Sequence, residues 1–154
     1  MLSLILFVGM IASPAQAFLM QNLAAERINL HEYLGDGRWT LVMFWSLDCV
    51  PCEAQKPMIE SFYQAHKQSR ANVIGIALDG PKYQKQIQAR IDKNKTTYTN
   101  FVAFDDVIYK QFVEEVGKPY HATPTYVMYD PNGNLVGMHT GPIERAALDS
   151  VVRQ

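Results

Sequence analysis

The stretch TLVMFWSLDCVPCEAQKP, residues 40–57, decides the fold of this chain. It begins with an apolar run that is rich in aromatic and β-branched residues, a pattern typical of a buried strand. A short polar break follows, and the only two cysteines of the sequence, Cys49 and Cys52, come directly after it. The stretch therefore predicts a strand, a turn and the start of a helix that carries a Cys-x-x-Cys motif.

The place of the two cysteines at a helix start favours thiol chemistry. Backbone N–H groups are unpaired at a helix N-terminus and the helix dipole is positive there, so a cysteine ionises more easily. The thiolate attacks disulfides, and we predict that Cys49 is the nucleophile. Cys52 lies one turn further along the same face, where it can attack a mixed disulfide on Cys49 and release the partner. A structural disulfide is a poor interpretation, because so short a ring constrains the unfolded chain little.

Several features together resemble the thioredoxin superfamily. They are the strand before the cysteines, the motif itself, Pro57 inside the following helix, and Thr123-Pro124-Thr125 before a later strand. From about residue 28 to the C-terminus the chain most resembles the exported TlpA-like thiol–disulfide oxidoreductases of the ResA and DsbE type. The resemblance implies an α/β thioredoxin fold, with a central mixed β-sheet flanked by helices on both faces. It also implies a TlpA-like helix–strand insertion, which fits the segment between Pro81 and Phe104.

The resemblance also assigns a second functional segment. It implies that the Thr123–Pro124 peptide bond is cis and faces the cysteines. The backbone of Thr123 would then offer strand-like hydrogen bonds to an incoming polypeptide. Thr123 and Pro124 are therefore the predicted substrate-docking residues.

The rest of the chain alternates strand and helix patterns, which favours βαβ units. Residues 72–78 and 100–104 are apolar runs of strand length. Between them, Tyr83, Ile87 and Ile91 are spaced as the apolar stripe of one helix.

Turn and cap signals set further boundaries. Asp105 and Asp106 are predicted to cap the helix that follows the second of these strands. Residues 130–134 read DPNGN, a hairpin signal between two antiparallel strands. Gly141-Pro142 is predicted to start the last helix.

The N-terminus predicts export to the periplasm. Leu2–Ala12 is a short apolar run, and Ala15-Gln16-Ala17 is a small-x-small cleavage signature, so residues 1–17 are interpreted as a signal peptide. No Lys or Arg precedes the run, and an uncleaved membrane anchor is the alternative. Residues 18–154 are then one thioredoxin-like domain.

Composition limits the partners. The formal net charge of −1 provides no basic stripe, so nucleic acid is not an expected partner. No ligand-type residues lie at metal spacing, and we predict no metal site and no cofactor beyond the redox-active cysteine pair. We expect a monomer.

Four positions depart from the pattern of the relatives. Met43 replaces a polar Asp or Asn in the strand, and a thioether cannot accept a proton from the second cysteine. Asp48 replaces a Trp, and a carboxylate beside the first cysteine opposes its ionisation, so Asp48 is predicted to tune that pKa. Glu53 and Gln55 stand where Arg and Glu are common. These changes leave the dithiol chemistry intact.

Two functions fit these residues. The first is a periplasmic thiol–disulfide oxidoreductase that reduces disulfides in exported proteins and is fed by a membrane electron donor, as the resemblance implies. The alternative is a copper-handling or other metal-binding thioredoxin-like module, because thiolates suit Cu(I) and the sequence has seven methionines. The methionines are scattered and no His lies beside the cysteine pair, which favours the first function.

Overall fold

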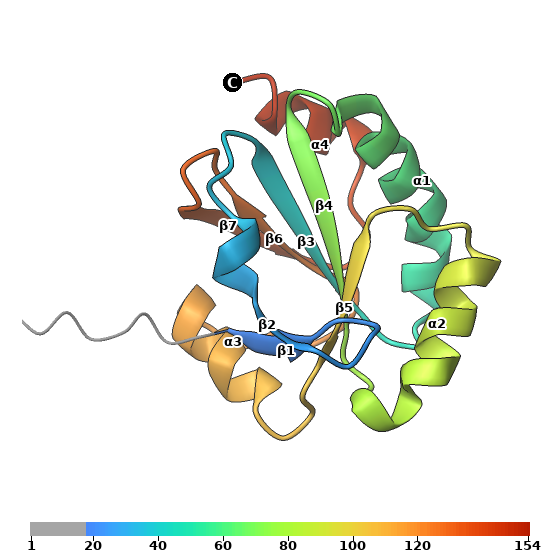
Figure 1. Ribbon diagram of the computed structural model, residues 1–154. Helices are drawn as coiled ribbons and strands as arrows, with labels where there is room; N and C mark the ends of the chain where they lie inside the picture. Colours follow the sequence, from blue (N-terminus) through green and yellow to red (C-terminus); the bar gives the residue numbers. More distant parts are fainter. Residues whose placement is uncertain (1–17) are drawn as a thin grey trace, which may run out of the picture.

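The computed structural model describes residues 18–154, which form one mixed sheet with helices on both faces (Figure 1). The strands are β1 (Leu19–Gln21), β2 (Arg27–Asn29), β3 (Trp39–Trp45), β4 (Ala71–Ala77), β5 (Thr99–Ala103), β6 (Thr125–Tyr129) and β7 (Leu135–Thr140). The helices are α1 (Val50–His66), α2 (Gln84–Lys93), α3 (Ile108–Val116) and α4 (Arg145–Val151), with 3₁₀ turns η1 (Leu30–Tyr33) and η2 (Pro81–Tyr83). The predicted signal peptide lies outside the described residues.

The strand order is β2-β1-β5-β4-β3-β6-β7. Strand β4 pairs in parallel with both β3 and β5, whereas the other pairs are antiparallel. This is the mixed sheet that the resemblance implies, and α2 with β5 forms the predicted insertion. Within residues 18–154 no helix is long and apolar enough to cross a membrane.

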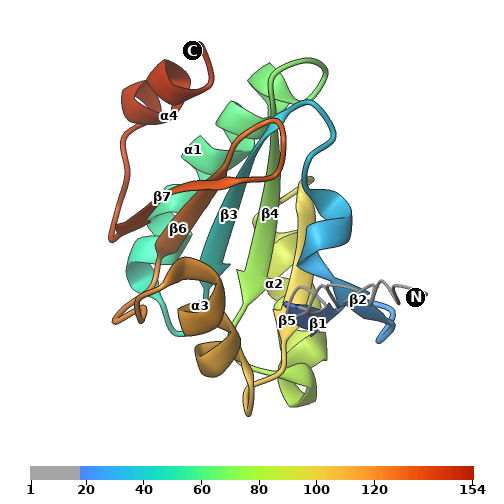
Figure 2. The ribbon, with the colours of Figure 1, turned by 90° about the vertical axis from the view of Figure 1, so that its left-hand side faces the viewer.

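The central strand β3 is buried on both faces, and its side chains supply two separate cores. Leu41, Met43 and Trp45 pack against α1, α2 and α4, whereas Val42 and Phe44 pack against α3 and η1. Figure 2 shows α1 and α3 on opposite sides of the sheet. Strand β3 lies inside the sheet between β4 and β6, and the two cysteines that follow it pack in the core on the side of α1, α2 and α4.

Tyr83 does not join the predicted helical stripe. It belongs to η2, before α2 begins, and it is 40% exposed, whereas Ile87 and Ile91 are buried. A 3₁₀ turn has three residues per turn rather than 3.6, so Tyr83 is rotated away from the apolar face of α2.

The prediction that Asp105 and Asp106 cap the next helix is wrong. Helix α3 has no side-chain cap, because the backbone carbonyl of Phe104 accepts hydrogen bonds from the N–H groups of Val107 and Ile108. The carboxyl group of Asp105 instead lies against Gly80, where an added Cβ would approach its Cγ to 2.9 Å.

The last helix begins later than Gly141-Pro142. Gly141 has a φ of +92°, and its N–H donates to the carbonyl of Pro124 at 2.8 Å, so this residue is held in a bend beside that loop and does not start a helix. Helix α4 starts at Arg145.

Candidate active site

The two cysteines form a disulfide bond at the N-terminus of α1. Cys49 is the N-cap residue, and its Sγ accepts a hydrogen bond from the backbone N–H of Cys52 at 3.1 Å. Cys49 is 6% exposed and Cys52 is fully buried, while Val50 between them is 79% exposed. Cys49 is thus the less buried of the two cysteines, and the division of their roles stays a prediction.

The loop between β3 and α1 is held through the backbone N–H and the backbone carbonyl of Leu47. The N–H of Leu47 donates to the two carboxylate oxygens of Asp79 at 3.0 and 3.2 Å. Arg90 of α2 donates to the carbonyl of Leu47 at 2.9 Å. Burial of Asp79 raises its pKa, although the Leu47 N–H opposes that shift. The loop before Cys49 is thus held by Asp79 from the loop after β4 and by Arg90 from α2.

The predicted docking residues lie beside this loop. The antiparallel register pairs Phe44, at the end of β3, with Thr125, at the start of β6. The loop that enters β6 therefore lies next to the loop that leaves β3, and the hydroxyls of Ser46 and Thr123 are 3.4 Å apart. The Thr123–Pro124 peptide bond is cis. Docking of a polypeptide on Thr123 and Pro124 stays a prediction.

Asp48 lies on the outside of the site. It is exposed, and the helix is capped by the Sγ of Cys49 rather than by the Asp48 carboxylate. Its charge reaches Asp79, where it adds to the larger effect of burial in raising that pKa. Its effect on Cys49 stays a prediction.

Lys56 is a site residue that the sequence analysis missed. Its side chain is 3% exposed, and its Nζ lies 3.6 Å from the centroid of the Trp45 ring. The Nζ donates to Glu53 at 2.7 Å. Glu53 also contacts Arg90 at 3.1 Å and accepts a hydrogen bond from Asn94 at 2.9 Å. Glu53, which directly follows Cys52 in α1, thus joins Lys56 and Arg90 in a cluster of three charged side chains, and we call it the inner charge cluster.

Burial shapes the ionisation of this cluster. It lowers the pKa of Lys56, and the hydrogen bond and charge of Glu53 offset only part of that shift. Burial also acts to raise the pKa of Glu53, but hydrogen bonds from Lys56 and Asn94 outweigh it, so this pKa is lowered. The helical period could have found Lys56, because Cys52 four residues earlier and Ile59 three residues later are both buried.

Gln55 fastens the motif helix to the rest of the domain. Its side-chain oxygen accepts hydrogen bonds from the Tyr126 hydroxyl at 3.0 Å and from the Ile143 N–H at 2.8 Å. Burial raises the pKa of Tyr126, so this hydroxyl stays a proton donor at neutral pH. A neutral amide thus joins α1 to β6 and to the segment before α4.

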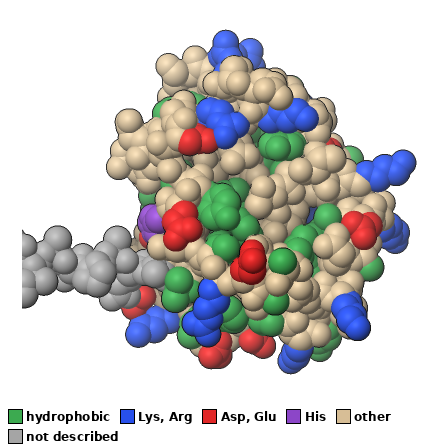
Figure 3. All heavy atoms as spheres, in the orientation of Figure 1, with side chains coloured by type: hydrophobic (Ala, Val, Ile, Leu, Met, Phe, Trp, Pro, Cys, Tyr) green, Lys and Arg blue, Asp and Glu red, His purple; other side chains and the backbone are tan. Residues whose placement is uncertain are grey.

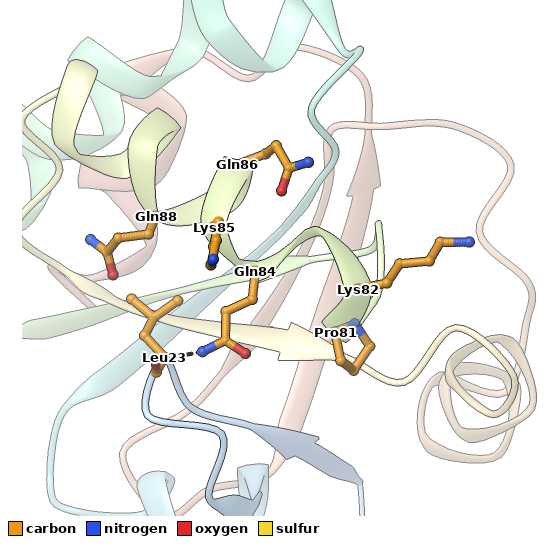
Figure 4. A pocket seen from close by; sticks show the side chains of 7 residues that line it. All are labelled: Leu23, Pro81, Lys82, Gln84, Lys85, Gln86 and Gln88. Carbon is orange, nitrogen blue, oxygen red and sulfur yellow. Dashed lines mark hydrogen bonds between the residues drawn. The ribbon is translucent and has the colours of Figure 1, made fainter.

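Other surface features lie apart from these residues. Figure 4 shows a pocket of about 730 Å³ beside η2 and α2, where Gln84 donates to the carbonyl of Leu23 at 2.6 Å. It is lined by Leu23, Pro81, Lys82, Gln84, Lys85, Gln86 and Gln88. Acidic and basic side chains are interspersed over the face in Figure 3. Among residues 18–154 no three His, Cys, Asp or Glu side chains gather as metal ligands.

The AhpC/TSA family matches residues 11–138. The chain is 27% identical over 124 residues to a thiol–disulfide oxidoreductase, ResA, of Halalkalibacterium halodurans, which covers 80% of this chain and 65% of that protein. It is also 27% identical over 135 residues to sporulation thiol–disulfide oxidoreductase A of Bacillus subtilis, covering 86% and 74%. The chain therefore spans less than two thirds of the length of the first of these relatives.

Solved structures show the same fold. StoA from Bacillus subtilis has a TM-score of 0.65 and 24% identity, and it covers 90% of this chain and 97% of its own. The thioredoxin domain of a thiol–disulfide oxidoreductase from Bacteroides vulgatus has a TM-score of 0.71 and 18% identity, covering 91% and 96%. The predicted thioredoxin-like α/β fold is confirmed.

Proposed function

The chain belongs to the AhpC/TSA family, and on this premise we propose that it is a thiol–disulfide oxidoreductase that reduces disulfides in exported proteins. The observation that carries the proposal is the disulfide between Cys49 and Cys52 at the start of α1, with one sulfur near the surface and the other buried. The two relatives named as thiol–disulfide oxidoreductases support it.

The reaction exchanges one disulfide for another. In the reduced protein the Cys49 thiolate is favoured by the helix N-terminus and by the N–H of Cys52. It attacks one sulfur of the partner's disulfide, and the other sulfur leaves as a thiolate that takes up a proton. The Cys52 thiolate then attacks Cys49, so the second partner sulfur leaves and is protonated in turn. The partner gains two electrons and two protons, and the enzyme is left with its own disulfide.

The partner docks on the backbone of Thr123 as an extended segment. The pairing of β3 with β6 supports this, because it lays the loop of Thr123 and Pro124 against the loop before Cys49. A strand added there would present its disulfide beside the exposed side of Cys49.

We propose that the protein acts in the periplasm and that it reduces, rather than forms, the disulfides of its partners. The cleavage signature at residues 15–17 supports export, and the negative charge of Asp48 beside Cys49 supports a reducing pair because it disfavours the thiolate form. Turnover then needs a dithiol donor at the membrane that reduces the enzyme again.

Three measurements test the proposal. A Cys52→Ser variant should accumulate a mixed disulfide with insulin. The wild-type protein should reduce the disulfides of insulin with dithiothreitol as the electron donor. Equilibration of the wild-type protein with glutathione gives its reduction potential. A value near that of thioredoxin, about −270 mV, supports a reductase, whereas a value near about −120 mV is that of a strong oxidant and would overturn the direction.

A further inference from the structure

Cys52 has to ionise inside the protein before it can resolve the mixed disulfide. It is fully buried, and burial in apolar surroundings raises the pKa of a thiol. Strand β3 offers no acid or base for this step. Its residues in the same core as Cys52 include Met43, whose thioether cannot accept the proton. Some other group must lower the cost of the Cys52 thiolate.

The nearest cation on the same helix face is Lys56. It lies four residues after Cys52, and side chains at this spacing are neighbours, with Cβ atoms about 5–6 Å apart. Long side chains on a helix lean toward its N-terminus. The contacts of the Lys56 Nζ with Glu53 and with the Trp45 ring show that this side chain does so. The ammonium group is thus directed back toward the turn that holds the cysteines.

We propose that the ammonium group of Lys56 promotes ionisation of Cys52 and so speeds the step that resolves the mixed disulfide on Cys49. The inference rests on the proposed function and adds a positioning residue to it. In this step Cys52 loses its proton to solvent, its thiolate bonds to the Cys49 sulfur, and the bond from Cys49 to the partner sulfur breaks. The partner sulfur leaves with the electron pair and is protonated.

The other charges around Lys56 and Cys52 set the size of the effect. Glu53 pairs with Lys56 on α1, Arg90 approaches from α2 and Asp79 from the loop after β4. Tyr126 of β6 stays protonated, and Asp48 lies outside on the preceding loop. Glu53 is shared between Lys56 and Arg90, so it only partly neutralises the charge of Lys56.

The two thiol steps can be timed separately. One equivalent of dithiobis(nitrobenzoate) is mixed with reduced full-length protein in a stopped-flow instrument. Attack by Cys49 releases the first coloured thiolate, and attack by Cys52 releases the second. A Cys52→Ser variant identifies the first phase, since it lacks the second.

Lys56→Met removes the charge and keeps the length of the side chain. We expect it to raise the pH at which the second phase reaches half its maximum by about one unit. Below that pH the thiolate fraction falls about tenfold, but a more basic thiolate is the stronger nucleophile, so the second phase slows by roughly threefold. Above it the variant is as fast or faster, and the two pH profiles cross.

Two control variants make the result decisive. Lys56→Arg, which keeps the charge, should restore the wild-type half-point, and Lys110→Met, at a lysine that is 82% exposed, should leave both phases unchanged. A purely structural role would slow the second phase of Lys56→Met by one factor at every pH, and that result, like superimposed profiles, would overturn the inference. Absence of both phases from the wild-type protein would instead overturn the proposed function.

Discussion

The two ends of α1 both hold charged groups, but they use them in different ways. Near the N-terminal end, Lys56 is 3% exposed and shares Glu53 with Arg90 behind the disulfide. At the C-terminal end, His66 contacts Asp149 of α4 at 2.8 Å, and Arg145 donates to the same carboxylate at 2.9 Å. These side chains are partly exposed.

The two clusters differ in how much hydration their charged groups lose on folding. A charge taken out of water loses hydration that an ion pair rarely compensates in full, so the buried ammonium of Lys56 is expected to add little to stability. At the far end no side chain is as deeply buried as Lys56: the exposed fractions are 14% for His66, 21% for Asp149 and 31% for Arg145, so each loses less hydration, and the His66–Asp149 contact joins α1 to α4. The comparison teaches that charge buried beside the cysteines belongs to the chemistry of the site, while charge at the far end belongs to the fold.

The largest expected effect follows from Glu53→Gln. The change leaves the buried ammonium of Lys56 without its counter-ion, and we expect a loss of about 3 kcal/mol in the free energy of unfolding at pH 7. Urea denaturation measures it. The pKa of Glu53 is lowered in the folded protein, so its contribution is present above the unfolded pKa of about 4.3 and is lost as the pH falls through the folded pKa. The deficit of the variant should therefore shrink in acid, and an equal deficit at every pH would contradict this reason.

Lys56→Met should act in the opposite direction on stability. It replaces a buried cation with an apolar chain of similar length, and Glu53 keeps Arg90 and Asn94 as partners. We expect the free energy of unfolding at pH 7 to stay equal or to rise by about 1 kcal/mol. The pKa of Lys56 is lowered on folding. The free energy of unfolding of the wild-type protein should therefore rise relative to that of the variant as the pH rises through the folded pKa toward about 10.4. A clear loss of stability in Lys56→Met would mean that the inner charge cluster holds the fold together.

Asp149→Asn tests the far end of α1. The carboxylate contacts both His66 and Arg145, and we expect its loss to lower the free energy of unfolding by about 0.5–1 kcal/mol at pH 7. Burial acts to raise the pKa of Asp149, but the hydrogen bonds from Arg145 and His66 lower it overall. The contribution is therefore present above about pH 4 and lost as the pH falls through the folded pKa. The rates of both thiol phases should be unchanged, and a slowed phase would break the division between the two ends.

The sequence reveals the features that depend on local pattern. The strand before the cysteines, the motif and the hairpin at residues 130–134 each occupy one short segment, and the structure has β3, α1 and the β6–β7 hairpin there. The thioredoxin-like fold could be predicted because these local segments carry the resemblance to the superfamily. Helix boundaries were less accurate, because a 3₁₀ turn at Tyr83 and the Gly141–Pro124 hydrogen bond override the local signals.

The inner charge cluster could not be predicted in the same way. Glu53 and Lys56 are neighbours in α1, but Arg90 and Asn94 come from another helix, and a sequence gives no register between two helices. A lysine on a predicted helix is normally taken as a solvent-exposed residue. Only the burial of Cys52 and Ile59 on the same face marks Lys56 as different.

The smallest expected effect concerns Asp48, the exposed residue that directly precedes Cys49, whereas Lys56 is buried on the helix that follows it. The two charges have opposite signs, and each should act on the nearer sulfur: Asp48 on Cys49 and Lys56 on Cys52. Asp48 is exposed, so water and salt screen it. Asp48→Asn should therefore lower the pKa of Cys49 by about half a unit and make the reduction potential less negative, because the thiolate becomes less costly. Thiolate absorbance in the Cys52→Ser background measures the pKa, and the first stopped-flow phase should shift with it while the pH half-point of the second does not. If the pKa of Cys49 stays the same or rises, the carboxylate points away from the sulfur, and the reducing character of the pair has to come from the buried side of the disulfide alone.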